Sequence, residues 1–243
     1  MAVPPAGCAL MRIPEHVLRA FQVDGEGEPT SEAWGSGLRF GRVVIAPAQE
    51  DSAWSAKVRE RVAPDRGVRL SRPVRATDGR FVVGGFAATE FAEGAPAARV
   101  DEVMSASLLI DAALHSIPAP ATEPGEGSWR DYDRAVWAGE DFHGEHVVAD
   151  LDLLRRCLFD GSAPPFVSAL TPSADVRPRG YTAALVMVDG LLADAVDAHV
   201  VQRWAHIPHL RALAGKALEF RQLTTPQSNI GAEFRRVAQI VFP

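Results

Sequence analysis

The first 94 positions alternate short apolar runs with glycine-rich turns. Two glycines, Gly84 and Gly85, interrupt the last run, and Asp51 or Ser52 is placed to cap a helix start. We therefore predict a small, mostly antiparallel sheet with one helix laid on it. The spacing of apolar residues predicts helices over 14–21 and 49–62, two strands joined near Gly41 within 34–46, and further strands over 68–74 and 81–91.

After Gly94 the apolar positions recur at helical spacing. A segment rich in proline and glycine, 118–127, reads as a linker, and two apolar runs flank the turn at 160–161 as in a short hairpin. The second part is therefore predicted to be mainly helical around one hairpin. The helical patterns cover 100–115, 181–194, 197–206, 209–223 and 231–241.

Composition and charge narrow the class of protein. The formal net charge is −6 and no run of Lys or Arg occurs, so a nucleic-acid partner is not expected. No apolar run approaches the roughly 18–20 residues that cross a bilayer, and the first residues have no apolar leader segment. Cys8 and Cys157 cannot form a zinc site alone. We expect a cytoplasmic protein with reduced thiols and no membrane partner.

Several stretches, among them Thr-Asp-Gly-Arg-Phe-Val-Val-Gly-Gly-Phe, resemble an uncharacterised actinobacterial family related to aminoglycoside phosphotransferases and so to protein kinases. The resemblance implies an α+β, protein-kinase-like two-lobe fold. A sheet-rich N-lobe would cover 1–94 and a mainly helical C-lobe would cover 95–243. The stretches that carry the resemblance are 33–34, 39–44, 54–60, 68–74, 77–86, 91–94, 133–137, 158–161, 170–172, 187–191 and 203–208.

Phosphoryl transfer in such a fold needs a lysine on the third strand, a catalytic-loop Asp, and metal-binding Asn and Asp residues. On the resemblance, Ala46 stands at the lysine position, Cys157 at the Asn position and Ala169 at the metal-binding Asp position. The His of the catalytic loop is replaced by Asp150. The resemblance therefore implies a catalytically degenerate, pseudokinase-like protein that needs no cofactor and holds no metal.

Asp152 is the one residual catalytic candidate, because it falls on the base position of that loop. A structural explanation is also open. The run 150–156 has acidic residues at its start and two arginines at its end, which suits the dipole of a short helix.

Aromatic and basic residues supply the candidate binding positions. Trp129, Tyr132 and Trp137 lie near the expected mouth of the cleft between the lobes and could contact a ligand, although tryptophans are also common core anchors. Arg69 and Arg72 flank a predicted strand, where they could meet an anionic partner or simply face solvent.

Two other patterns have structural explanations beside functional ones. His143 and His146, with Asp141 and Glu145, form a local group that could ligate a metal or form a solvated loop. The glycines within 35–41 do not have the spacing of a phosphate loop and read as turn glycines.

Three hypotheses for function follow from these observations. The first is a non-catalytic binding or scaffold subunit whose cleft recognises a peptide or protein, beside a separate kinase or lyase that does the chemistry. The second is an enzyme that uses Asp152, Cys157 or a histidine for residual phosphotransfer or for other acid–base or thiol chemistry. The third is a small-molecule binder without turnover. We expect a protein or peptide partner.

Overall fold

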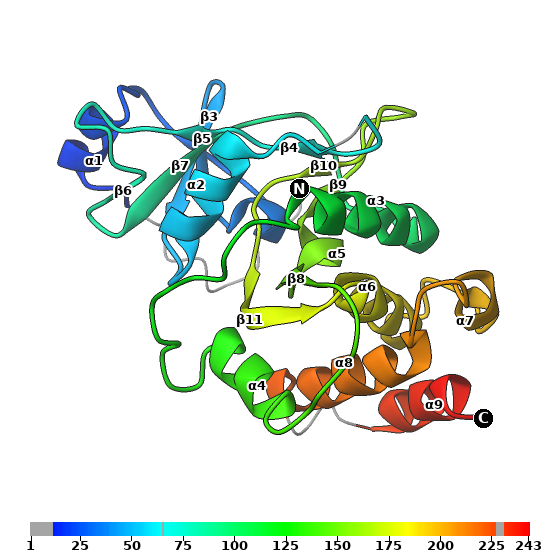
Figure 1. Cartoon of the computed structure of the whole chain (residues 1–243). Coiled ribbons are helices and arrows are strands. Elements are labelled where there is room, and N and C mark those ends of the chain that lie inside the picture. Colours follow the sequence, from blue (N-terminus) through cyan, green and yellow to red (C-terminus); the bar gives the residue numbers. More distant parts are fainter. Residues whose placement is uncertain (1–11, 65, 227–230) are drawn as a thin grey trace.

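The computed structural model describes residues 12–64, 66–226 and 231–243, which form an α+β fold with an antiparallel sheet near one end and helices at the other (Figure 1). Cys8 lies outside the described residues. None of the described helices has the length and apolar character needed to cross a membrane.

The largest sheet lies in the first part of the chain and is antiparallel throughout. One of its central strands buries the adjacent residues Val44 and Ile45 in two different apolar clusters, and the next strand buries Ala88, so apolar side chains cover both faces of the sheet there. The strand order is β1-β2-β3-β7-β5, with β6 paired to β7. The strands are β1 (Glu28–Pro29), β2 (Leu38–Phe40), β3 (Val43–Pro47), β5 (Pro73–Val74), β6 (Val82–Val83) and β7 (Phe86–Glu90).

The segment 81–91 forms a hairpin where one interrupted strand was predicted. Gly84 and Gly85 occupy the two-residue turn between β6 and β7, with φ of 57° and 80°. Two consecutive residues with positive φ produce the tight reversal that suits the twist of antiparallel strands. The glycines therefore reverse the chain.

Two helices pack on this sheet. Both were predicted as helices, but only one was predicted to lie on the sheet. α1 (Glu15–Ala20) and the residues after it bury Val17 and Phe21 against Ile45 and Ala88 of the sheet. α2 (Ser52–Arg61) contacts β5. The side chain of Asp51 makes no hydrogen bond to the end of α2, so the predicted cap is absent.

The predicted strand over 68–74 is divided between two sheets. Its end is β5, whereas its start is β4 (Arg69–Leu70), which pairs in parallel with β10 (Phe166–Val167). β10 also pairs with β9 (Cys157–Leu158), which confirms the predicted hairpin around 160–161. Ser71 causes the division: its backbone N–H donates to Val167 at 2.9 Å, while its hydroxyl donates to Glu90 at 2.7 Å. This small sheet joins the two parts of the chain.

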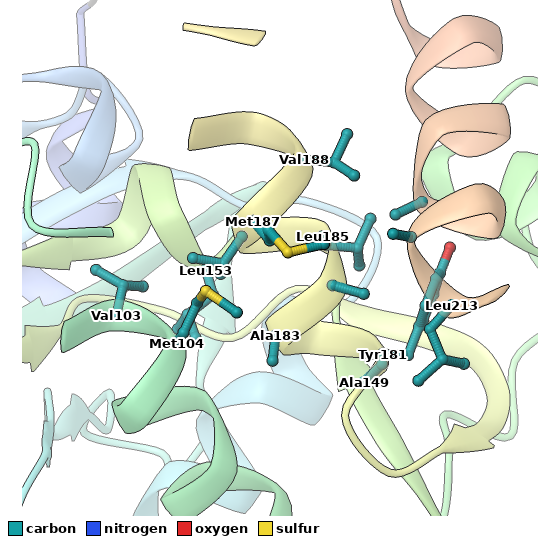
Figure 2. Packing of buried hydrophobic residues seen from close by; sticks show 14 of the residues in the cluster. Val103, Met104, Ala149, Leu153, Tyr181, Ala183, Leu185, Met187, Val188 and Leu213 are labelled. Carbon is teal, nitrogen blue, oxygen red and sulfur yellow. The ribbon is translucent and has the colours of Figure 1, made fainter. Parts of the chain in front are cut away.

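The second part of the chain is built around α6 (Tyr181–Leu192), which is buried on nearly every side. The apolar residues of α6 meet those of neighbouring helices in one continuous core, in which Met104, Leu153 and Met187 lie close together and Leu213 lies beside Tyr181 (Figure 2). A helix that is apolar all round belongs at such a centre. The other helices here are α3 (Val100–Ala113), α4 (Trp129–Val136), α5 (Leu153–Arg156), α7 (Val200–Arg203), α8 (Leu210–Thr224) and α9 (Ala232–Val241).

One strand pair in this part was not predicted. β8 (His146–Asp150) pairs antiparallel with β11 (Pro172–Pro178), and α4 packs on β11. The Asp133 carboxylate of α4 accepts hydrogen bonds from the backbone of Ala174 at 2.9 Å and from Arg177 at 2.6 Å. These contacts hold the segment before β11 in place, and that segment forms part of the candidate site.

Candidate functional site

A cleft of about 460 Å³ lies between the sheet and the helical part of the chain. β3, β7 and α2 line one side, and α5, the start of α4 and the segment between β10 and β11 line the other. Ala46, Asp152 and Ala169, which are far apart in sequence, all line this cleft. The fold therefore brings together three of the positions that the resemblance singled out.

The chain is closely packed at Ala46. The backbone of the segment 35–37 lies against its side chain: a Cβ atom added to Gly37 would lie 2.9 Å from the Cβ of Ala46, and one added to Gly35 would lie 3.2 Å from it. Gly35 also has a φ of 70°, which favours glycine. A long side chain at position 46 would meet this segment before it reached the cleft.

Trp34 lines the apolar end of the cleft. Trp34 is the last residue of the 3₁₀ turn η1 (Glu32–Trp34) and is 6% exposed. Its ring centroid lies 5.1 Å from that of Phe91 and 5.8 Å from that of Phe166. Val44 and Leu158 belong to the same apolar cluster. The Trp34 ring thus forms part of the apolar lining of the cleft.

Asp152 is buried at the start of α5 and still reaches the cleft. Its carboxylate lies 3.3 Å from Nε of Arg155 and 3.5 Å from Nε of Arg156. Burial raises the pKa of this carboxyl group, and the two arginines oppose that shift. Asp152 does begin a short helix with arginines at its end, as the structural explanation supposed, but its side chain forms no cap hydrogen bond.

Asp150 lies behind the cleft and does not line it. Its carboxylate accepts hydrogen bonds from the backbone of Asp152 at 2.9 Å and of Thr171 at 3.1 Å. Complete burial raises its pKa to about 7. Asp150 therefore holds the loop before α5 against the segment before β11, which positions Asp152.

Cys157 is buried in β9 and does not line the cleft. Burial raises the pKa of its thiol to about 12, so the thiolate that nucleophilic chemistry needs is scarce at neutral pH. None of the seven histidines, all of which the structure describes, lines the cleft either. The cleft lining therefore contains neither the thiol nor a histidine that the second hypothesis named.

The three aromatic candidates lie in different environments in the structure. Trp129 lines the cleft, with its ring edge-on to Phe220 at 5.9 Å and the Arg221 guanidinium 5.3 Å from its centre. Tyr132 is half-buried against the core and lies outside the cleft. Trp137 is 8% exposed and packs against Tyr181 at 4.9 Å. Trp137 is thus a core residue, and its expected place at the cleft mouth was wrong.

The arginines of the first part also lie away from the cleft. Arg69 is exposed, its guanidinium lies 5.6 Å from the centre of the Phe166 ring, and it donates to the carbonyl of Pro164 at 3.4 Å. Arg72 is exposed too. The structure therefore does not bring these two residues together with Trp129 in one binding surface.

Residues of the possible metal site around His143 and His146 instead contact other parts of the chain. Glu145 pairs with Arg179 at 2.9 Å and with His115 at 2.7 Å, and His146 contacts the carbonyl of Gly144 at 2.9 Å. Over the described part of the chain, no group of three or more His, Cys, Asp or Glu side chains is placed to hold a metal ion.

Sequence reasoning missed the arginines that shape the cleft. Arg59 points from α2 into the interior and donates to the carbonyls of Ser71 at 2.8 Å and Ser168 at 3.0 Å. Arg156 donates to the carbonyls of Glu32 and Ala33 at 3.2 and 3.3 Å. The one available signal was that Arg59 follows Ser55 by four residues and Val58 by one, which places it on the buried side of its helix.

No protein-family model matches this chain, and a comparison with functionally characterised proteins finds no match either.

Proposed function

We propose that this chain is a kinase-like two-lobe protein whose cleft binds a peptide or protein without transferring phosphate. It would act as a binding or scaffold subunit beside a separate kinase or lyase. One observation carries the proposal: Ala46 and Ala169 line the same cleft as Asp152, and Trp34 lines the apolar end of that cleft.

The arrangement of the two parts supports the kinase-like relationship. The antiparallel sheet with α1 and α2 falls within 1–94 and the large helical core falls within 95–243, with the cleft between them. The candidate base, Asp152, begins α5 just before a two-stranded hairpin, and Ala169 follows that hairpin. This order matches the positions that the resemblance assigns.

The lost charges argue against phosphoryl transfer. A lysine and two metal ligands each stabilise the transferring phosphate by on the order of several kcal/mol. Ala46 and Ala169 have no charge to supply at those positions, and Cys157 is buried away from the cleft. A cleft kept open without these groups is most simply a recognition site.

A second candidate function is an enzyme that uses Asp152 as a general acid or base. The observation in its favour is that Asp152 is buried and lines the cleft, and that burial raises its pKa. Catalytic carboxyl groups are often tuned in this direction. Turnover that disappears in Asp152→Asn would establish this candidate over the scaffold.

The deciding experiment combines a binding measurement with a transfer assay. The purified chain, incubated with radiolabelled ATP and Mg²⁺, should transfer no phosphate to a mixture of peptides. The tagged chain, isolated from the cells that make it, should carry a stoichiometric partner that Trp129→Ala loses. Phosphoryl transfer by the purified chain would overturn the proposal, as would turnover of a substrate in the absence of any partner.

A further inference from the structure

Arg59 is a buried cation whose partners are all neutral. The side chain is 7% exposed and donates to two backbone carbonyls and, at 3.5 Å, to the hydroxyl of Thr89. Its Nε has no hydrogen-bond partner. Within the described ranges, no carboxylate forms an ion pair with it. A buried charge without a counter-charge is costly, and in most folds it is paired.

A second guanidinium lies close to the first. Arg156 reaches the same region, because its main-chain carbonyl accepts from the backbone of Ser168 at 3.1 Å and its side chain donates to Ala33. Burial, and then the charge of Arg156, lower the pKa of Arg59 to about 10, so Arg59 stays charged at neutral pH. Two adjacent cations repel, and an anion between them would relieve that repulsion.

The charge of the cleft differs from that of the whole protein. The chain has a net charge of −6, yet four arginines and three carboxylates line the cleft. Two of those carboxylates, Glu50 and Asp51, are paired with Arg130. The part of the cleft beside Arg59 and Arg156 is its inner end. The one lining carboxylate there, Asp152, is paired with both Arg155 and Arg156. The inner end of the cleft therefore has an excess of positive charge.

We infer that the inner end of this cleft binds the oxyanion of a ligand, a carboxylate or phosphate group, held between Arg59 and Arg156. The inference rests on the proposed function in taking the cleft as a recognition site, and it adds the chemistry of the group recognised. Guanidinium groups suit this role because their planar donors match the geometry of both anions. Asp152 lies at the edge of the site, where it limits how many negative charges the ligand carries inward.

The test uses simple anions and peptides on the full chain at low ionic strength. We expect saturable binding of inorganic phosphate, of acetate, or of a short glutamate peptide with an amidated C-terminus by calorimetry, with no binding of the matching amidated glutamine peptide. Phosphate binding alone would identify a free phosphate or phosphorylated ligand as the source, and glutamate-peptide binding would identify an acidic peptide. Each result supports the oxyanion site.

Variants locate the site. Arg156 is half-buried, so Arg156→Gln should fold, and it should weaken binding about tenfold or more, as expected for a lost charged hydrogen bond. Arg156→Lys should recover part of the affinity, because it restores the charge without the planar donors. Arg19→Gln, an equal change of charge on exposed α1, is the matched control and should bind as the wild type does.

Two outcomes would overturn the inference: no binding of any of the three anions, or binding that Arg156→Gln and Arg19→Gln weaken equally. These outcomes are separate from the fate of the proposed function. Anion binding together with phosphoryl transfer would refute the scaffold and keep the site. A confirmed partner without anion binding would support the scaffold and refute the anion site.

Discussion

Nη1 of Arg130 lies 2.9 Å from a carboxylate oxygen of Asp51, which is 79 residues earlier in the chain. The contact joins the start of α4 to the start of α2 at the wall of the cleft. The same Nη1 also contacts Glu50 at 2.9 Å, and Arg130 is 1% exposed. Burial raises the pKa of Asp51 to about 6, and Arg130 opposes that shift. One buried arginine therefore connects the sheet and the helices.

Arg130→Gln should lower the free energy of unfolding by about 3–5 kcal/mol, because it leaves two partly buried carboxylates unpaired. Urea denaturation followed by circular dichroism measures this change. The control is Arg134→Gln on the same helix, whose pair with Glu123 is exposed and whose loss should change the free energy of unfolding little. Equal losses in the two variants would show that the Arg130 contacts contribute no more than a surface pair.

Trp137 in the core and Trp129 in the cleft should respond differently to removal. Trp137→Ala should lower the free energy of unfolding by about 3–5 kcal/mol, because the ring packs against Tyr181 in the core. Trp129→Ala should keep the fold and weaken association with a partner about tenfold or more. Thermal melts and a binding titration measure the two effects. A Trp129→Ala variant that binds normally would remove this residue from the recognition surface.

Asp150 should make stability depend on pH. Burial raises its folded-state pKa to about 7, well above that of the unfolded chain, so between about pH 4 and 7 the folded state holds a proton that the unfolded state releases. The free energy of unfolding should therefore fall as pH rises through this range, with a contribution from Asp150 on the order of 4 kcal/mol.

The control for this pH dependence is a change at Asp150 itself. Asp150→Asn should have a shallower slope, while Asp51 and Asp111, whose pKa burial also raises to about 6, keep the remainder. Asp160→Asn, at an exposed position, should leave the slope unchanged. Urea denaturation at several pH values supplies the measurement, and a wild-type slope in Asp150→Asn would contradict the assignment.

A lysine introduced on β3 should not create binding of ATP with Mg²⁺. Ala46→Lys should lower the midpoint of thermal unfolding by several degrees, because the segment 35–37 packs against the Ala46 side chain. Ala53→Lys, at an exposed position of α2, should change the midpoint little. An Ala46→Lys variant that is fully stable and binds ATP with Mg²⁺ would show that this segment moves aside readily.

Some of the site could be predicted from residue types alone. Ala46 and Ala169 carry no charge, so the absence of a lysine and of a metal-binding carboxylate at those positions needed no structure. The two arginines could not be paired from the sequence, because Arg59 and Arg156 are 97 positions apart. Their proximity depends on how α2 packs beside the hairpin. Trp137 shows the same limit, since proximity in sequence to Trp129 did not place it in the same cleft.

The sequence by itself determined much of the local structure: the β9–β10 hairpin, the strands on either side of Gly41 and the helices of the second part other than α4 and α5 follow from apolar periodicity and turn residues. Tertiary structure decided the rest. β11 begins and ends at prolines, which conceal a strand from its residue pattern, and Asp133 of α4 holds it through hydrogen bonds from Ala174 and Arg177. Ser71 likewise directs one short run into two sheets through bonds to distant residues. Periodicity reports which side of an element is buried, and only the packed chain decides what lies opposite that side.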